Sequence, residues 1–383
     1  MRDMQELAAL AARLDGVKAL SIYLDWSDVD LGHRERWRVV LKQRLAALRA
    51  SLTHSPHAER VAFEACTARL LSLLPPLGET LEGWGWMGFA TATGATHAES
   101  LPVAVPTAVT WDNRLRIAPC VGAAETRPAL VVVVDHHHAV FHRYERLRLS
   151  RIEELVREEH VSITRPMQDV PRAGFHTGTR GTAARDDASR QLQSAYKRFR
   201  AEVQRRIAAL DRNDTWLVLA GAPEVVTHVA GDLPSIRRAR THVAREIGAA
   251  PSGMELAEGV ARAVEALLRA RVGGEIATVV ADAARGARAA LGAAPVAAAL
   301  QRGAVDLLLL TRRLITDDPD TAERLVRAAL AEGGRVEEVR GADAEALERA
   351  GGGIAAALRF ALTPVASAVP PGTTADRERA ASP

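Results

Sequence analysis

The densest run of chemically active side chains is basic and lies between residues 180 and 206. This segment contains eight cationic residues and three acidic ones, Asp186, Asp187 and Glu202, so its local charge is +5. The cations are Arg180, Arg185, Arg190, Lys197, Arg198, Arg200, Arg205 and Arg206. Guanidinium and ammonium groups at this density suit contact with the phosphates of a nucleic acid. The alternative is an ordinary solvated helix face, where such residues are common.

The segment just before this run has the character of a long loop. Residues 157–182 lose apolar periodicity and gather prolines and glycines, which is typical of a loop that carries function or is disordered. Its end reads His176-Thr177-Gly178-Thr179-Arg180-Gly181-Thr182, with separate glycines and no glutamine.

Four histidines, His136, His137, His138 and His142, raise the question of a metal site. Consecutive side chains diverge, and no cysteine, aspartate or glutamate set at ligand spacing completes a site. The turn of a β-hairpin explains the run better. The sequence has no P-loop, nucleophile elbow or HExxH pattern, so nucleotide hydrolysis and hydrolase chemistry lack a motif.

Apolar patterning predicts the elements that position the basic segment. The β-branched run at 129–134 indicates a strand, linked by a turn to a second strand from residue 139. A single helix is expected from about Asp186 to Leu210, with acidic groups in its first turn. A strand at 215–220 and a helix after Pro223 complete an α/β unit.

An α/β unit is also predicted on each side of this one. The first has a strand at 19–24, helices near 34–52 and 57–74, and strands around 84–91. Its tryptophans, Trp26, Trp37, Trp84 and Trp86, are expected to fill the core rather than to form a base-stacking platform.

Before the last unit, a helix is expected at 253–271. A second helix at 275–301, after Gly273 and Gly274, opens this unit. A strand at 304–310, a helix at 318–332, a strand at 336–339, a helix at 343–349 and a final strand follow.

Length and composition agree with three consecutive mixed α/β domains. The 383 residues are 48% hydrophobic and 25% charged, as in soluble globular proteins. We place the domains at 1–120, 125–270 and 275–365, with a disordered tail at 366–383. Cys66 and Cys120 match no CxxC spacing, and no signal peptide or membrane span is evident. A cytoplasmic protein without a membrane partner is expected.

Two motifs near the C-terminus carry a family resemblance. Gly303-Ala304-Val305-Asp306-Leu307-Leu308-Leu309 and Gly351-Gly352-Gly353-Ile354-Ala355-Ala356-Ala357-Leu358-Arg359-Phe360 resemble segments that bracket the C-terminal domain of archaeo-eukaryotic class-1 release factors and Pelota. That domain is a compact α/β/α sandwich. Residues 134–141 are similar to the opening of the family's middle domain. The resemblance covers about 125–362, and the N-terminal unit is only loosely similar to the decoding domain.

The resemblance also shows what is missing. The family uses a Gly-Gly-Gln loop, whose backbone approaches the ester bond of peptidyl-tRNA. Here the loop at 176–182 stands in its place without that tripeptide. No catalytic residue is therefore expected, and neither a cofactor nor a metal. The chain resembles most the Balon group of ribosome hibernation factors.

Such a factor would occupy the vacant A site and inhibit translation in stressed cells, with a translational GTPase such as elongation factor Tu as a partner. The implied ribosomal RNA contacts are His176, Thr177, Gly178, Thr179, Arg180, Gly181, Thr182, Arg185, Arg190, Lys197, Arg198, Arg200, Arg205 and Arg206. Two alternatives remain open: a peptidyl-tRNA hydrolase or rescue factor with an altered loop, and an RNA-binding or structural protein that works away from the ribosome.

Overall fold

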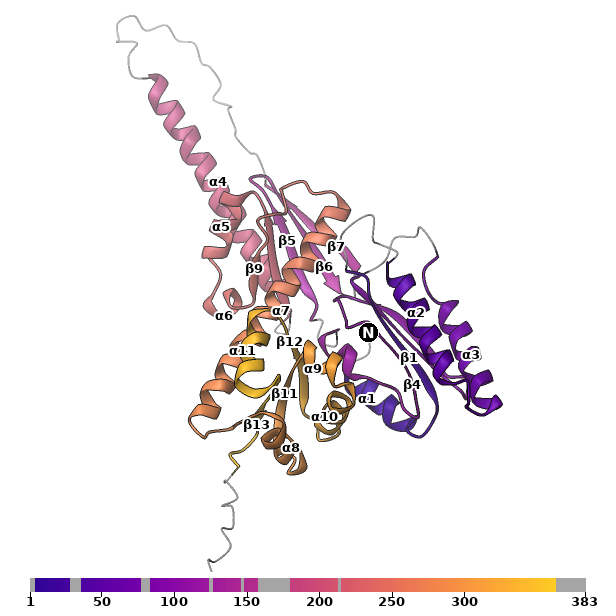
Figure 1. Ribbon diagram of the computed structural model, residues 1–383. Helices are drawn as coiled ribbons and strands as arrows, with labels where there is room; N and C mark the ends of the chain where they lie inside the picture. Colours follow the sequence, from indigo (N-terminus) through magenta and orange to yellow (C-terminus); the bar gives the residue numbers. More distant parts are fainter. Residues whose placement is uncertain are drawn as a thin grey trace, which may run out of the picture.

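The structure is a computed structural model that describes residues 4–27, 36–76, 83–123, 127–145, 148–157, 180–212 and 215–362. Three mixed α/β units follow one another along the chain, each built on its own sheet (Figure 1). The predicted fold class is therefore confirmed. The predicted tail at 366–383 lies outside the described residues. Among the helices that are described, none is long and apolar enough to cross a membrane.

The first unit is a four-stranded antiparallel sheet in the order β3-β2-β1-β4. Its strands are β1 (Ala19–Asp25), β2 (Gly85–Thr91), β3 (Thr96–Leu101) and β4 (Ala108–Asp112). One face packs against α2 (Arg36–Ser51) and α3 (His57–Leu71). Trp26, Trp37 and Trp86 are buried in this core as predicted, whereas Trp84 is only half-buried.

The other face of this sheet shares its core with the third unit. Tyr23 and Met87 belong to the same buried cluster as α1 (Met4–Arg13) and α10 (Pro319–Ala331). Figure 1 shows α1 beside α10, and residues of the two helices are in contact. Burial raises the pKa of Tyr23 well above its usual value, so its hydroxyl stays neutral and donates to the carbonyl oxygen of Arg116. The first and third units are thus joined by apolar packing.

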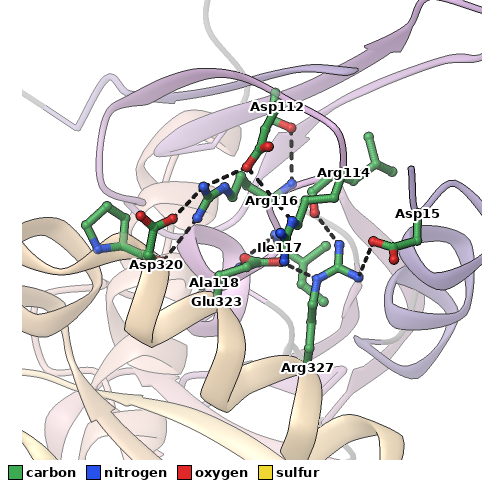
Figure 2. Close-up of polar contacts among 12 residues, drawn as sticks. Asp15, Asp112, Arg114, Arg116, Ile117, Ala118, Asp320, Glu323 and Arg327 are labelled. Carbon is green, nitrogen blue, oxygen red and sulfur yellow. Dashed lines mark hydrogen bonds and ion pairs between the residues drawn. The ribbon is translucent and has the colours of Figure 1, made fainter. Parts of the chain in front are cut away.

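A buried carboxylate adds polar contacts to this junction (Figure 2). Glu323 of α10 is 1% exposed, and its Oε2 accepts the backbone N–H groups of Ile117 and Ala118, each at 2.9 Å. Its Oε1 accepts from Arg327 at 2.7 Å, and Arg327 also donates to the carbonyl oxygen of Leu115 at 2.6 Å. A buried charge is tolerable only when it is satisfied in this way.

A second buried carboxylate, that of Glu338, also adds polar contacts to this junction. It lies beside the 3-10 helix η1 (Ala118–Ala123). Glu338 accepts from Arg312 at 2.6 Å and from Arg340 at 2.8 Å. Both arginines also donate to the carbonyl oxygen of Ala104 in the first unit. A side chain at Gly122 would collide with the Glu338 carboxylate, so glycine is needed for this close approach.

The middle unit is a five-stranded mixed sheet in the order β7-β6-β5-β8-β9, with β5, β8 and β9 parallel. Helices α4 and α5 cover one face, and the first half of α7 covers the other. A short helix, α6, leads into β9. The bounds are β5 (Ala129–Val134), β6 (His138–Glu145), β7 (Arg148–Val156), α4 (Arg180–Leu210), β8 (Trp216–Gly221), α5 (Pro223–Gly231), α6 (Ser235–Arg238), β9 (Thr241–Val243) and α7 (Gly253–Ala284).

The third unit is a four-stranded sheet in the order β10-β13-β11-β12. Helices α8, α9 and α10 lie on one face, while α11 and the second half of α7 lie on the other. This arrangement confirms the predicted α/β/α sandwich. The bounds are β10 (Ala289–Leu291), α8 (Ala293–Gln301), β11 (Val305–Thr311), α9 (Arg312–Asp317), β12 (Arg335–Val339), α11 (Ala342–Gly351) and β13 (Ile354–Leu358).

One helix prediction is wrong. Instead of breaking at Gly273 and Gly274, the chain forms the single 32-residue helix α7 through both glycines. Val272 and Ile276, on either side, are buried against the third sheet. Each glycine costs a helix only about 1 kcal/mol relative to alanine, and burial of these apolar neighbours outweighs that cost. The predicted second helix at 275–301 is in fact the end of α7, strand β10 and α8.

Candidate nucleic-acid interface

Helix α4 is attached to its sheet by only part of its length. Phe199, Val203 and Ile207, at four-residue spacing, are buried against the middle sheet. The side chains of residues 190–194 are exposed, and Figure 1 shows the first part of α4 extending beyond the rest of the unit. At about 1.5 Å per residue, the 31 residues span roughly 46 Å. Helix α4 is therefore an arm that extends from the middle unit. We call its packed C-terminal part, from residue 196 to residue 210, the root.

The cations of this arm lie on the face opposite its anchor. Arg190, Lys197 and Arg205 are about two turns apart in succession, and Arg198 lies beside them. All four are exposed, and they lie away from the face that Phe199 turns to the core. Within the described parts of the chain, Lys197 and Arg198 have no ion-pair partner, so their charges are available for a phosphate.

Other cations of the predicted set are engaged within the middle unit. Arg200 pairs with Asp232 of the turn after α5. Glu202 pairs with both Arg205 and Arg206, and Arg206 also lies 3.4 Å from Glu153 of β7. Exposed pairs of this kind contribute about 1 kcal/mol or less, so Arg205 and Arg206 remain able to exchange partners. Arg200, only 21% exposed, is the most constrained.

The remaining predicted residues lie at or beyond the start of the helix. His176, Thr177, Gly178 and Thr179 are outside the described residues. Arg180, Gly181, Thr182 and Arg185 lie in the first turns of α4, which begins earlier than the expected start near Asp186. The run Ala183-Ala184-Arg185 favours helix strongly enough to explain this earlier start.

A second group of arginines, after α5, holds elements of the middle unit together. Arg237 and Arg240 pair with Asp211 at 2.8 and 3.4 Å. Arg238 donates to the carbonyl oxygens of Gly231 and Leu233. These hydrogen bonds and ion pairs join the end of α4 to α5 and α6.

The histidine run forms the predicted hairpin turn between β5 and β6. Asp135 Oδ1 accepts the backbone N–H groups of His137 at 2.7 Å and His138 at 2.6 Å. Although burial opposes it, these two bonds lower the pKa of Asp135. In the described parts of the chain, no three His, Cys, Asp or Glu residues are grouped to hold a metal ion.

Two residues at the root of the arm, Tyr196 and His228, were not predicted from the sequence. The ring of Tyr196 on α4 lies 6.1 Å from that of His136 and 6.3 Å from that of His228 on α5. Tyr196 occurs next to the basic residues in sequence, which is a usable signal. His228 lies about 30 residues away, and nothing local links it to α4.

The two C-terminal motifs lie side by side. Strand β11, from the first motif, pairs antiparallel with β13 from the second, with Leu310 opposite Ile354. Gly352 ends α11 at φ +59, and a side chain at Gly353 would lie 2.5 Å from Thr311 Oγ1. The glycine run therefore allows a left-handed helix end and a close approach between strands.

Among solved structures, the chain is similar to Pelota proteins and to a translation termination factor. Pelota from Archaeoglobus fulgidus is 16% identical, covers 72% of this chain and 79% of its own, and has a TM-score of 0.39. Archaeal Pelota in a model of ribosome-bound Pelota and ABCE1 is 14% identical, covers 94% and 95%, and has a TM-score of 0.35. The archaeal translation termination factor aRF1 is 19% identical, covers 94% and 99%, and has a TM-score of 0.25.

No protein-family model matches the chain, and no curated protein matches it.

Proposed function

We propose that this chain is a ribosome-binding translation factor of the release factor and Pelota type. It occupies the vacant A site and inhibits translation during stress, as in the Balon group. The observation that carries the proposal is the arm α4, with its row of exposed cations opposite the anchored face. The sequence resemblance at 303–309 and 351–360 supplies the ribosome as the partner.

The arm suits a site lined with RNA. Its first 16 residues, 180–195, precede the part anchored in the core and would reach about 24 Å beyond it. Lys197 and Arg198 place unpaired charge near the root, where binding to phosphates would release counterions. A cavity walled by ribosomal RNA matches both the reach and the charge. A translational GTPase such as elongation factor Tu is the proposed protein partner.

The proposed activity is occupation rather than catalysis. The segment 176–182 has no glutamine, so the proposed factor blocks the A site without hydrolysing peptidyl-tRNA. Inhibition then depends on binding alone, and should be relieved when tRNA displaces the factor.

The decisive experiment is cryo-electron microscopy of ribosomes isolated from starved cells that express the protein. Density for three α/β units in an A site empty of tRNA is the expected result, and purified protein should inhibit translation of a reporter messenger RNA in an extract. Ribosomes that carry no such density in starved cells would refute the proposal.

A peptide-release assay separates the proposal from the rescue-factor alternative. Ribosomes carrying labelled peptidyl-tRNA should retain their peptide when the purified protein is added. A true release factor provides the positive control, and release far above background would make this chain an enzyme.

A further inference from the structure

Three rings form a row at the root of the arm. His136 comes from the turn between β5 and β6, Tyr196 from α4, and His228 from α5. Both imidazoles are exposed, and the Tyr196 ring between them is half-buried. The row therefore offers planar ring surface to solvent.

The row lies where sheets of this class bind ligands. His136 follows the carboxyl end of β5, and α5 follows the carboxyl end of the parallel strand β8. Crevices beyond the carboxyl ends of parallel strands are the usual binding positions in α/β folds. Side chains from three elements converge there, which one helix face could not achieve alone.

Cations lie beside the rings. The Arg200 guanidinium lies 5.8 Å from the centre of the Tyr196 ring, and its pair with Asp232 holds it there. Lys197 follows Tyr196 directly on α4 and is exposed, whereas Arg198 lies on the far side of the helix. Arg157, at the end of β7, donates to the ring of His137 at 3.2 Å.

The Tyr196 hydroxyl is buried and lacks a hydrogen-bond partner among the residues that the structure describes. A buried hydroxyl in this state costs about 1 to 3 kcal/mol compared with a bonded one. Burial also raises its pKa, so it remains protonated and able to donate. A group that supplies an acceptor at this position would recover the missing bond.

We propose that this row is a binding site for single-stranded RNA, in which an unstacked base stacks on the exposed imidazoles and the neighbouring phosphates contact Lys197 and Arg157. Rings interleaved with cations are the combination that recognises unpaired nucleotides. A phosphorylated peptide would use the cations but not the rings. The inference rests on the proposed function for the source of the RNA, and adds to it a contact with a base.

The test uses a single-stranded RNA of about ten nucleotides with 2-aminopurine near its centre, because stacking quenches this fluorescent base. Wild-type protein should quench it. The double variant His136→Ala, His228→Ala removes two exposed rings and should bind roughly 10-fold more weakly and lose the quenching. The same RNA as a duplex should bind both proteins equally, because its bases are not free to stack.

Two further variants complete the design. Tyr196→Phe keeps the ring and removes the hydroxyl, and should retain the quenching. His54→Ala removes an exposed histidine in the first unit and should change nothing. Thermal unfolding of each variant shows that the fold is intact. Full quenching and affinity in the double variant would overturn the base-stacking site.

Sedimentation of the wild-type protein with ribosomes, measured in parallel, keeps the two proposals apart. Sedimentation without ring-dependent quenching rejects only the stacking site. Ring-dependent quenching without sedimentation rejects only the ribosome as the partner.

Discussion

His142 is a titratable ring placed in the middle of a sheet. It lies on β6, half-buried, and its Nδ1 has no hydrogen-bond partner among the described residues. Burial lowers its pKa, and the Arg151 guanidinium on the neighbouring strand lowers it further. The folded middle unit therefore disfavours the protonated ring.

This shift predicts a loss of stability in mild acid. The unfolded chain binds the proton near pH 6.5, before the folded chain does, so the free energy of unfolding should fall as pH drops from about 6.5 through the lowered folded pKa. His142→Gln removes this contribution, so the urea midpoint of the variant should depend less on pH in that window. His54→Ala, at an exposed site, should keep the wild-type dependence, and identical pH profiles for wild type and His142→Gln would contradict the prediction.

At the scale of single residues, the sequence shows where charged side chains gather, but it does not show which of them are paired. The composition of 180–206 correctly indicated a charged face on α4, but not which charges are neutralised. Arg200 is paired by Asp232, 32 residues away, and Arg206 by Glu153, 53 residues away. Such partners are set by how β7 and α5 pack beside α4, and that packing leaves no local pattern.

Among the elements, α4 offers the sharpest test of charge. Lys197→Gln together with Arg198→Gln should lower ribosome affinity and flatten its salt dependence, by roughly 0.7 to 0.9 in log–log slope for each phosphate that is no longer neutralised. Arg200→Gln breaks the pair with Asp232 and should change the slope less. The matched control is Lys42→Gln with Arg44→Gln, which removes the same residue types from the exposed side of α2. Equal slopes for the wild type and the α4 variant would make this face merely solvated.

Substitution of a glycine can test whether helix α7 is continuous through Gly273 and Gly274. Gly274 lies inside the helix with open space beside it, since nothing lies within 4 Å of the position that an alanine Cβ would take. Gly274→Ala should therefore stabilise the protein by up to about 1 kcal/mol and raise its melting temperature. Gly286, just after the helix at φ +65, has equally open surroundings but a left-handed backbone. Gly286→Ala should destabilise, and a stabilising effect there with none at Gly274 would contradict a continuous helix.

The elements also show where patterning fails. Strands with buried β-branched or leucine runs, such as β5 and β11, were placed within a residue or two by their apolar sequences. Gly273 and Gly274 indicated a break because glycine is a weak helix former. Burial of Val272 and Ile276 on a sheet formed by distant residues decided the outcome, and no window around the glycines contains that information.

In the whole molecule, the first and third units should unfold together. Glu323→Gln replaces one carboxylate oxygen by an amide NH2, so either Arg327 or both backbone N–H groups lose their acceptor in a buried site, which costs about 1 to 3 kcal/mol. Hydrogen exchange should then speed up equally at Ile22 in the first sheet and Leu308 in the third, while Val131 in the middle sheet stays protected. Glu345→Gln, an exposed site on α11, is the control. Faster exchange confined to one sheet would contradict a shared core.

The packing of α1 against α10 sets an order on folding during synthesis. About 300 residues separate the end of α1 from the start of α10. At about 5 to 20 residues per second, the apolar face of α1, with Met4 and Leu7, waits roughly 15 to 60 s for its partner. A chaperone has time to hold this helix, and a truncated chain that ends before α10 keeps it exposed. The earliest helix of the chain is thus among the last to be buried, which makes nascent chains of this protein vulnerable until synthesis is nearly complete.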